Sequence, residues 1–147
     1  MAERIELMTI EKLVPCIELY MNVFNSEPWN ENWSFEVAKE RLSDLINTPK
    51  FFGFSLYIEN NLIGFIAGNN KKSHQGLTYY LAELCIDKKV QGKGYGTKLL
   101  KILELELKNK DTKNLYLITS NSGVPEAFYK KNGYQVNDNR LVIKKNL

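Results

Sequence analysis

The feature that most constrains the fold is a glycine-rich turn that leads directly into an amphipathic helix. The stretch from Val90 to Lys108 has the sequence VQGKGYGTKLLKILELELK, with glycines at Gly92, Gly94 and Gly96. After the turn, leucines recur on one face of a helix, at Leu99, Leu100, Leu103 and Leu107. The preceding segment, LTYYLAELCID, has the apolar character of a buried strand. The pattern therefore predicts a strand, a tight turn and a long helix in direct succession.

Such a turn has the chemistry of an anion site. The first N–H groups of a helix have no partner within the helix, and they lie at the positive end of its dipole. Phosphates bind at such positions, and glycine lets the backbone approach them closely because no side chain intervenes. Four lysines surround the turn, at Lys88, Lys89, Lys93 and Lys98. They are either counter-charges for a diphosphate or solvated surface residues, and the sequence leaves both interpretations open.

Two common nucleotide-binding patterns do not fit this turn. The Walker pattern G-x-x-x-x-G-K-[ST] is absent from the chain. The dinucleotide pattern G-x-G-x-x-G requires a glycine where Thr97 stands, if Gly92 is its first glycine. The acidic residue that this pattern expects about twenty positions later is also missing. The turn is therefore predicted to hold the phosphates of a different ligand.

The remaining segments alternate between strand and helix patterns. Thr9 and Ser34 are candidate N-caps of two helices, and a short helix, PEAFYKKN, ends at Gly133. The expected strands are Glu3–Thr9, the two arms of a hairpin with its turn at Asn60-Asn61, Leu77–Asp87, Asn114–Ser120, and one or two closing strands within Tyr134–Lys145. This order predicts a mixed α/β (α+β) domain. Its central, mostly antiparallel twisted sheet has about six to seven strands flanked by about four helices, with one parallel crossover.

Length and composition narrow the class of protein. The chain has 147 residues, which suits a single domain over residues 1–147. A net charge of +3 is too small to indicate a nucleic-acid partner. No apolar run is long enough for a membrane span, and the opening MAERIELMTIEKL has no signal-peptide pattern, so we expect no membrane association and a cytoplasmic location. With two cysteines and one histidine, His74, the chain offers no metal-binding cluster.

The glycine turn resembles the signature of a known family. Gln91-Gly92-Lys93-Gly94-Tyr95-Gly96 fits Q/R-x-x-G-x-G/A, the acyl-CoA signature of the GNAT (GCN5-related) N-acetyltransferases. The segments LAELCIDKK and NSGVPEAFYKKNGY also resemble the fourth strand and the closing segment of that family. The resemblance implies the acyl-CoA N-acyltransferase fold, and transfer of an acetyl group from acetyl-CoA to a primary amine in a ternary complex. A homodimer is plausible on the same ground.

The resemblance also implies a cosubstrate site. The pyrophosphate of CoA would be bound by the turn, at Gln91, Gly92, Lys93, Gly94, Tyr95, Gly96 and Thr97. Backbone groups of Leu84, Cys85 and Ile86 would pair with the pantetheine arm like an added strand, and an N–H there would polarise the thioester carbonyl. Asn121 follows the next strand and is either a contact of the pantetheine arm or a turn residue.

Direct transfer to an amine needs a base and an acid. Glu83 is the candidate base because it stands between apolar residues of a strand, where partial burial would raise its pKa. The alternative is a salt-bridged or edge-exposed glutamate. Tyr129 is the candidate acid because its place in the short helix matches the family tyrosine that faces the CoA sulfur; the alternative is an ordinary packed aromatic. Strand alternation places Cys85 on the side of Glu83, but no activating base for a covalent role is evident.

The acceptor pocket is expected at the loop NSEPWNENW, between the first two helices. Two carboxylates and two tryptophans of this loop could hold a cationic amine by charge pairing and cation–π contacts: Glu27, Glu31, Trp29 and Trp33. Tyr79 and Tyr80 could contribute from the long strand. The alternative is that the tryptophans only pack the helix junction. The acceptor is a small molecule or a peptide amine. The sequence does not identify it, and it does not show which acyl chain is preferred.

Two other functions remain open. A non-catalytic acyl-CoA sensor would keep the glycine turn but lack groups for proton transfer, and Glu83 together with Tyr129 argues against it. A regulator that binds ATP or NAD at the turn is the second alternative, although the turn lacks both standard patterns.

Overall fold

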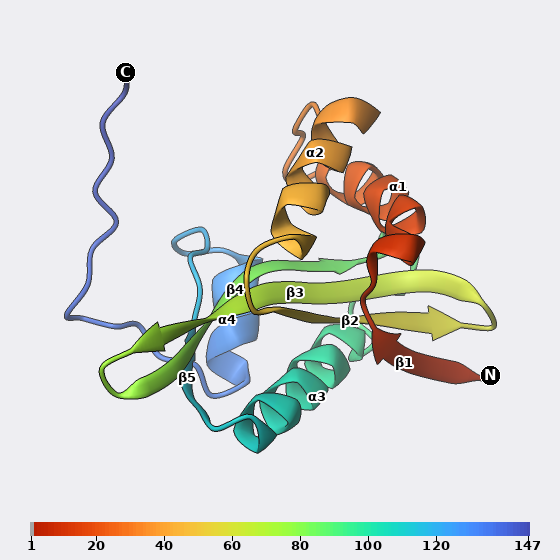
Figure 1. Ribbon diagram of the computed structural model, residues 1–147. Helices are drawn as coiled ribbons and strands as arrows, with labels where there is room; N and C mark the ends of the chain where they lie inside the picture. The colour runs from red at the N-terminus through yellow and green to blue at the C-terminus, as the bar shows by residue number, and fades with distance from the viewer. Residues whose placement is uncertain (1) are drawn as a thin grey trace. The chain divides into compact units, whose positions relative to one another are not determined.

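The computed structural model describes residues 2–147 (Figure 1). The chain forms two compact units, one ending at Leu117 and one running from Ile118 to Leu147. The described part of the first unit contains five strands, three α-helices and two short 3₁₀ turns. In chain order they are β1 (Glu3–Leu7), η1 (Ile10–Lys12), α1 (Leu13–Phe24), α2 (Phe35–Ile46), β2 (Phe51–Ile58), β3 (Asn61–Ser73), β4 (Gly76–Ile86), η2 (Lys88–Val90), α3 (Tyr95–Asn109) and β5 (Thr112–Tyr116). The second unit contains α4 (Val124–Lys131).

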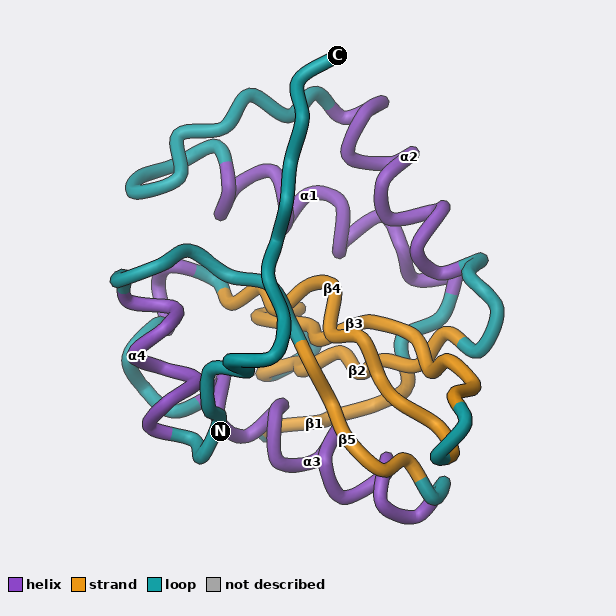
Figure 2. The backbone as a smooth tube through the Cα atoms, turned by 90° about the vertical axis from the view of Figure 1, so that its left-hand side faces the viewer, coloured by secondary structure: helices purple, strands orange, loops and turns teal. Residues whose placement is uncertain are grey.

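The five strands form one sheet in the order β1-β2-β3-β4-β5. Neighbouring strands are antiparallel except β4 and β5, which are parallel. The strand, helix and strand predicted as a crossover are therefore β4, α3 and β5. Helices α1 and α2 cover one face of the sheet and α3 covers the other, as Figures 1 and 2 show. The mixed α/β fold with a mostly antiparallel sheet is confirmed.

The core lies on both faces of this sheet. On the side of α1 and α2, one apolar cluster joins both helices to β3 and β4. On the other side, the four leucines predicted to share a face of α3 are all buried, at Leu99, Leu100, Leu103 and Leu107. Burial of a leucine side chain contributes about 2 kcal/mol to stability. The glycine turn is thus attached to a helix that is firmly anchored along its length.

Local sequence signals account for several element boundaries. The Ser34 hydroxyl accepts a hydrogen bond of 3.2 Å from the N–H of Val37, so Ser34 is the N-cap of α2 as predicted. The hairpin between β2 and β3 turns at Glu59 and Asn60, whose φ angles of 49° and 70° match a two-residue turn. This turn lies one residue before the predicted Asn60-Asn61. Asn61 is the first residue of β3.

In the second unit, Gly133 ends α4 as predicted. Its φ of 91° is left-handed, its N–H bonds the carbonyl of Lys130 at 3.1 Å, and the N–H of Tyr134 bonds the carbonyl of Tyr129 at 3.0 Å. These two bonds define a Schellman cap.

The closing strands predicted within Tyr134–Lys145 are absent, so the described residues form five strands rather than six to seven. A strand needs a neighbour for its N–H and C=O groups, and the second unit contains no other strand. The consecutive apolar residues Leu141, Val142 and Ile143 are not covered by neighbouring side chains, because each is at least 72% exposed. The apolar character of this segment alone was therefore misleading. Within residues 2–147, no helix combines the length and the apolar character needed to cross a membrane.

Candidate active site

The candidate site begins with an irregularity in β4. Ala67 of β3 pairs with Glu83 and Gly68 pairs with Leu81, so Ala82 is an extra residue that forms a β-bulge. The bulge reverses the side-chain alternation of β4, because Leu81 then faces α3 while Glu83 faces α1 and α2. β4 pairs with β5 only as far as Tyr80. Beyond that point, among the strands of the described chain, β4 keeps β3 as its one neighbour.

The stretch of β4 after the bulge therefore has an open edge. It includes Leu84, Cys85 and Ile86, the residues that the resemblance assigns to the pantetheine arm. An open strand edge presents N–H and C=O groups that can pair with another extended chain. The side chain of Gln91 donates to the carbonyl of Ile86 at 2.9 Å, which ties the end of this strand to the glycine turn.

The glycine turn fits an anion. Gly92 and Gly94 have φ angles of 80° and 87°, a conformation that strongly favours glycine. A Cβ at either position would meet no atom within 4 Å, so the turn is open as well as left-handed. Gly94 is the N-cap of α3 and no side chain caps this helix. The first helical hydrogen bond runs from the N–H of Lys98 to the carbonyl of Gly94, which leaves the N–H groups of Tyr95 to Thr97 at the helix mouth.

The lysines around this turn are not equivalent. Lys98 forms an ion pair with Glu3 of β1, and its ammonium lies 5.8 Å from the ring centroid of Tyr95. Lys88, Lys89 and Lys93 are exposed, and they form no ion pair with the described residues. Lys93 stands between the two left-handed glycines, so it is the lysine best placed to act as a counter-charge for an anion in the turn.

Glu83 lies on the α1 and α2 side of the sheet and is only 7% exposed. Its Oε2 accepts a hydrogen bond of 3.2 Å from the Tyr20 hydroxyl, and it lies 3.1 Å from both Nε and Nη2 of Arg41. Burial raises the pKa of the Glu83 carboxyl above its ordinary value, while the Arg41 guanidinium and the Tyr20 hydroxyl counteract that rise. Glu83 therefore combines two of its sequence-based interpretations, because it is both buried and salt-bridged.

An aromatic group adjoins this carboxylate. The rings of Tyr20 and Trp33 meet edge to face at 5.1 Å, and the Arg41 guanidinium lies 5.7 Å from the centroid of the Trp33 ring. The indole N–H of Trp33 donates to Oε1 of Glu31 at 2.7 Å. The loop thus brings one tryptophan and one carboxylate toward Glu83. We call Tyr20, Glu31, Trp33, Arg41 and Glu83 the Glu83 cluster.

The other predicted acceptor residues lie in different surroundings. Trp29 is half-buried and packs edge-on against Phe24 at 5.1 Å, next to the core. Glu27 is exposed. Tyr80 lies on the same face of β4 as Glu83, on the far side of the bulge, and its ring is 5.1 Å from that of Tyr116.

The two cysteines are buried thiols without a disulfide. Burial raises the pKa of Cys16 to about 11. Burial, assisted by the charge of Glu83, also raises the pKa of Cys85 well above its usual range. Cys85 faces the Glu83 side of the sheet as predicted, but its thiol is protonated at neutral pH and is a poor nucleophile.

Two predicted residues belong to the second unit. Asn121 is exposed, and its side-chain oxygen accepts a hydrogen bond of 3.2 Å from the Ser122 hydroxyl. Tyr129 is half-buried on α4, with its ring 5.1 Å from that of Phe128 and 5.6 Å from that of Tyr134. Their contacts within this unit fit a turn residue and a packed aromatic. The catalytic and binding roles of both residues stay predictions.

Sequence reasoning missed Tyr20 and Arg41 as members of the site. Tyr20 is one of the buried residues of α1, where an aromatic side chain is not by itself a sign of a functional site. Arg41 precedes the fully buried Leu42 and follows the buried Ala38 by three positions, so it borders the buried face of α2. The position of a charged residue at the border of an apolar helix face was the one sequence signal that could have pointed to Arg41.

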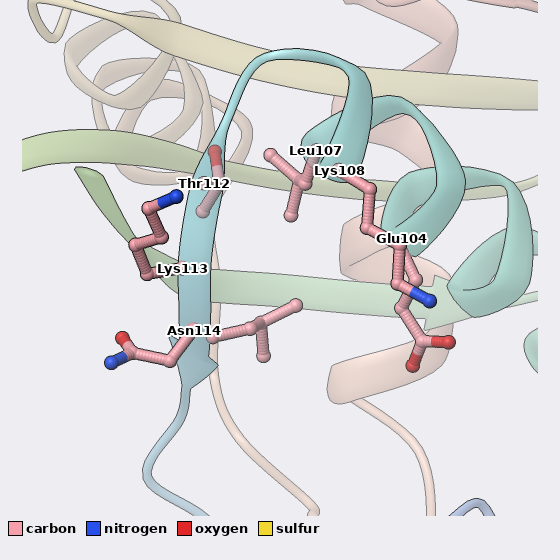
Figure 3. Close-up of a pocket in the computed structure, with 7 residues that line it drawn as sticks. Glu104, Leu107, Lys108, Thr112, Lys113 and Asn114 are labelled. Carbon is pink, nitrogen blue, oxygen red and sulfur yellow. The ribbon is translucent and has the colours of Figure 1, made fainter. Parts of the chain in front are cut away.

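A separate cavity of about 150 Å³ lies near the last turns of α3 (Figure 3). Its lining residues come from α3 and β5, and they are Glu104, Leu107, Lys108, Thr112, Lys113, Asn114 and Leu115. α3 has 15 residues, so its two ends are about 22 Å apart. The cavity is therefore not part of the glycine turn. The described residues also contain no group of three or more histidine, cysteine or acidic side chains that could hold a metal ion.

Comparisons with known proteins bear on the family and the fold. The family model described as an acetyltransferase (GNAT) domain matches residues 19–145. A Bacillus subtilis (strain 168) protein, the uncharacterised YdhI, is 31% identical over 112 residues, which is 68% of this chain and 70% of YdhI.

Two solved structures share the fold. A possible acetyltransferase from Clostridium difficile 630 has a TM-score of 0.84 at 12% identity, covering 100% of this chain and 99% of that one. The aminoglycoside N-acetyltransferase AAC(6')-Iy, solved in complex with CoA, has a TM-score of 0.78 at 12% identity, covering 99% of this chain and 95% of that one. These structures show the fold, and the family model over residues 19–145 shows that the chain belongs to the GNAT acetyltransferase family.

Proposed function

We propose that the protein transfers an acetyl group from acetyl-CoA to a primary amine of a small molecule or peptide, by direct transfer in a ternary complex. The observation that carries this proposal is the position of Glu83. Its buried carboxylate lies on the strand whose open edge leads, through Gln91, to the glycine turn. A base and an anion site on one continuous segment suit an enzyme better than a sensor that only binds its ligand.

The cosubstrate would be held largely by the backbone. The N–H groups at the mouth of α3, with the open turn at Gly92 and Gly94, suit the pyrophosphate, and Lys93 adds a positive charge. The open edge from Leu84 to Ile86 suits the pantetheine arm as an added strand. When bound, acetyl-CoA supplies an activated acyl group and a thiol leaving group.

The side chains would move protons. Glu83 takes a proton from the acceptor's ammonium group, either directly or through one water molecule. A backbone N–H of the open edge donates to the acyl carbonyl, where negative charge develops. Tyr129 donates its phenolic proton to the departing thiolate. This last role rests on the family resemblance of the α4 segment.

The acceptor would bind as a cation near the Glu83 cluster. Trp33 offers an aromatic face, and Glu31 adds a carboxylate next to it. Tyr80, on the same face of β4, would extend this surface, and Glu27 and Trp29 would contribute from the loop. A structural neighbour is an aminoglycoside N-acetyltransferase, which supports a small molecule with a cationic amine as the acceptor class.

Both units would belong to one GNAT domain. The division of the chain falls at Leu117, and the family model runs across it from residue 19 to residue 145.

Two measurements test the proposed function. Acetyl-CoA should raise the melting temperature by an amount that grows with the logarithm of its concentration over its Kd, whereas ATP and NAD should not raise it. An amine panel with acetyl-CoA should then release free thiol with at least one acceptor. Stabilisation by acetyl-CoA without thiol release across a broad panel would favour the non-catalytic sensor. Stabilisation by ATP or NAD instead would favour a nucleotide-binding regulator.

A further inference from the structure

The two oxygens of the Glu83 carboxylate have different surroundings. Among the described residues, this side chain has three polar contacts, one from Tyr20 and two from Arg41, and all of them fall on Oε2. Across the described residues, no fully buried side-chain nitrogen or oxygen lacks a hydrogen-bond partner. Oε1 has no such partner and therefore keeps access to solvent. The structure thus separates a held oxygen from an accessible one on the same carboxylate.

Arg41 is the cation of this site. The titratable groups that act on Glu83 come from every side of it: Tyr20 from α1, Arg41 from α2, Glu31 from the loop between them, and Cys85 from the same strand. Tyr20 and Cys85 are neutral at neutral pH, since burial raises the pKa of both groups. Glu31 carries the same sign of charge as Glu83. The ionised form of Glu83 therefore depends on the guanidinium of Arg41 more than on any other of these groups.

We propose that Arg41 is a positioning residue that holds Glu83 by Oε2 and leaves Oε1 as the atom that receives the acceptor's proton. This inference rests on the proposed function of Glu83 as the base. Tyr20 supports the same arrangement with its single hydrogen bond. The Trp33 ring in turn orients the Arg41 guanidinium. About half of the Arg41 side chain is exposed, so the ion pair between Arg41 and Glu83 is only partly shielded from water.

The arrangement accounts for one complete proton transfer. The N–H bond of the acceptor's ammonium breaks, an O–H bond forms at Oε1, and the nitrogen keeps its electron pair for attack. Glu83 becomes neutral, while Arg41 keeps its charge and stays on Oε2. Because the nearby guanidinium favours the ionised carboxylate, the proton can leave Oε1 for water before the next cycle.

The test is the titration of the Glu83 carboxyl, followed by ¹³C NMR and assigned by its loss in Glu83→Gln. Removal of the cation in Arg41→Gln should raise the pKa of Glu83 by about one pH unit or more, because an opposite charge at this distance favours the ionised form. Arg41→Lys should restore part of the shift. Lys39→Gln is the matched control, since it removes an exposed cation from the same helix and should leave the titration unchanged.

Kinetics provide the second readout. With an acceptor from the amine panel, the apparent pKa of the acidic limb of kcat/KM should be higher in Arg41→Gln than in wild type, by the same amount as in the NMR titration. The activity that this variant loses at low pH should therefore return at higher pH. The KM for acetyl-CoA should not change.

Three outcomes would contradict these assignments. If the titration of Glu83 is the same in Arg41→Gln and wild type, the role proposed for Arg41 is wrong, while Glu83 can still be the base. If Glu83→Gln leaves the acidic limb in place, the base assignment fails and this inference fails with it. If the wild-type protein does not bind acetyl-CoA, the proposed function itself is contradicted.

Discussion

The glycine turn and the Glu83 cluster are built in opposite ways. The turn is exposed, consists of consecutive residues, and offers backbone N–H groups. The cluster has a buried centre, Tyr20 and Glu83, and consists of side chains from two helices, a loop and a strand. Tyr20 and Arg41 lie 63 and 42 positions from Glu83 along the chain. A site made of backbone can be recognised from a short motif, whereas a site made of side chains exists only after the helices have packed on the sheet.

This contrast has a functional counterpart. If the turn holds the cosubstrate and the cluster moves protons, then changes at the turn should alter binding and changes at the cluster should alter turnover. The experiments on Glu83, Gly94 and Lys93 test this separation, and the experiment on Tyr129 tests whether a residue outside both regions alters turnover.

The largest effect is expected from Glu83→Gln. The amide cannot accept the ammonium proton, so kcat at neutral pH should fall about 1,000-fold while the Kd of acetyl-CoA stays within about twofold. Thiol release and isothermal titration measure the two quantities. A substantial loss of acetyl-CoA binding in this variant would show that the cluster also serves the donor site, and the contrast between the regions would fail.

The next effect is expected from Tyr129→Phe, which removes only a hydroxyl from α4. If the phenol protonates the thiolate, kcat should fall about 100-fold with unchanged acetyl-CoA binding. Tyr134→Phe is the matched control, because the Tyr134 ring packs against Tyr129 and the substitution likewise removes only a hydroxyl. Equal turnover in wild type and Tyr129→Phe at all pH values would leave Tyr129 as a packed aromatic.

A smaller effect is expected from Gly94→Val, on binding rather than on chemistry. The left-handed φ of Gly94 disfavours a β-branched residue by about 1–2 kcal/mol, so the turn should relax and the Kd of acetyl-CoA should rise about tenfold. Gly76→Val is the control, since Gly76 also has a positive φ but lies at the other end of β4. It should lower thermal stability without changing the Kd. An unchanged Kd in Gly94→Val would place the diphosphate elsewhere.

The smallest effect is expected from Lys93→Gln. The lysine is exposed, so its contribution is screened by salt, and the Kd of acetyl-CoA should rise about threefold at low ionic strength and less at 0.5 M salt. Lys101→Gln, at an exposed position of α3, should have no effect. If Lys93→Gln and Lys101→Gln raise the Kd of acetyl-CoA equally, the two lysines contribute only to the general charge of the surface.

Part of this architecture followed from the sequence. The leucines of α3 and the cap at Ser34 are local patterns, and they predicted the helices correctly. The prediction of closing strands was wrong because the apolar run from Leu141 to Ile143 shows the character of the residues, not whether a neighbouring strand exists. The bulge at Ala82 was not predicted, although it decides that Glu83 faces the two helices. A bulge is defined by pairing with another strand, so a single segment cannot reveal it.

The sequence by itself determined the glycine turn and its helix, because the left-handed φ of glycine and the unpaired N–H groups of a helix start are properties of consecutive residues. Only the tertiary structure decided that Glu83 is held through one oxygen and accessible at the other. That arrangement depends on where α1 and α2 place Tyr20 and Arg41 above the sheet, and the packing of distant segments sets those positions.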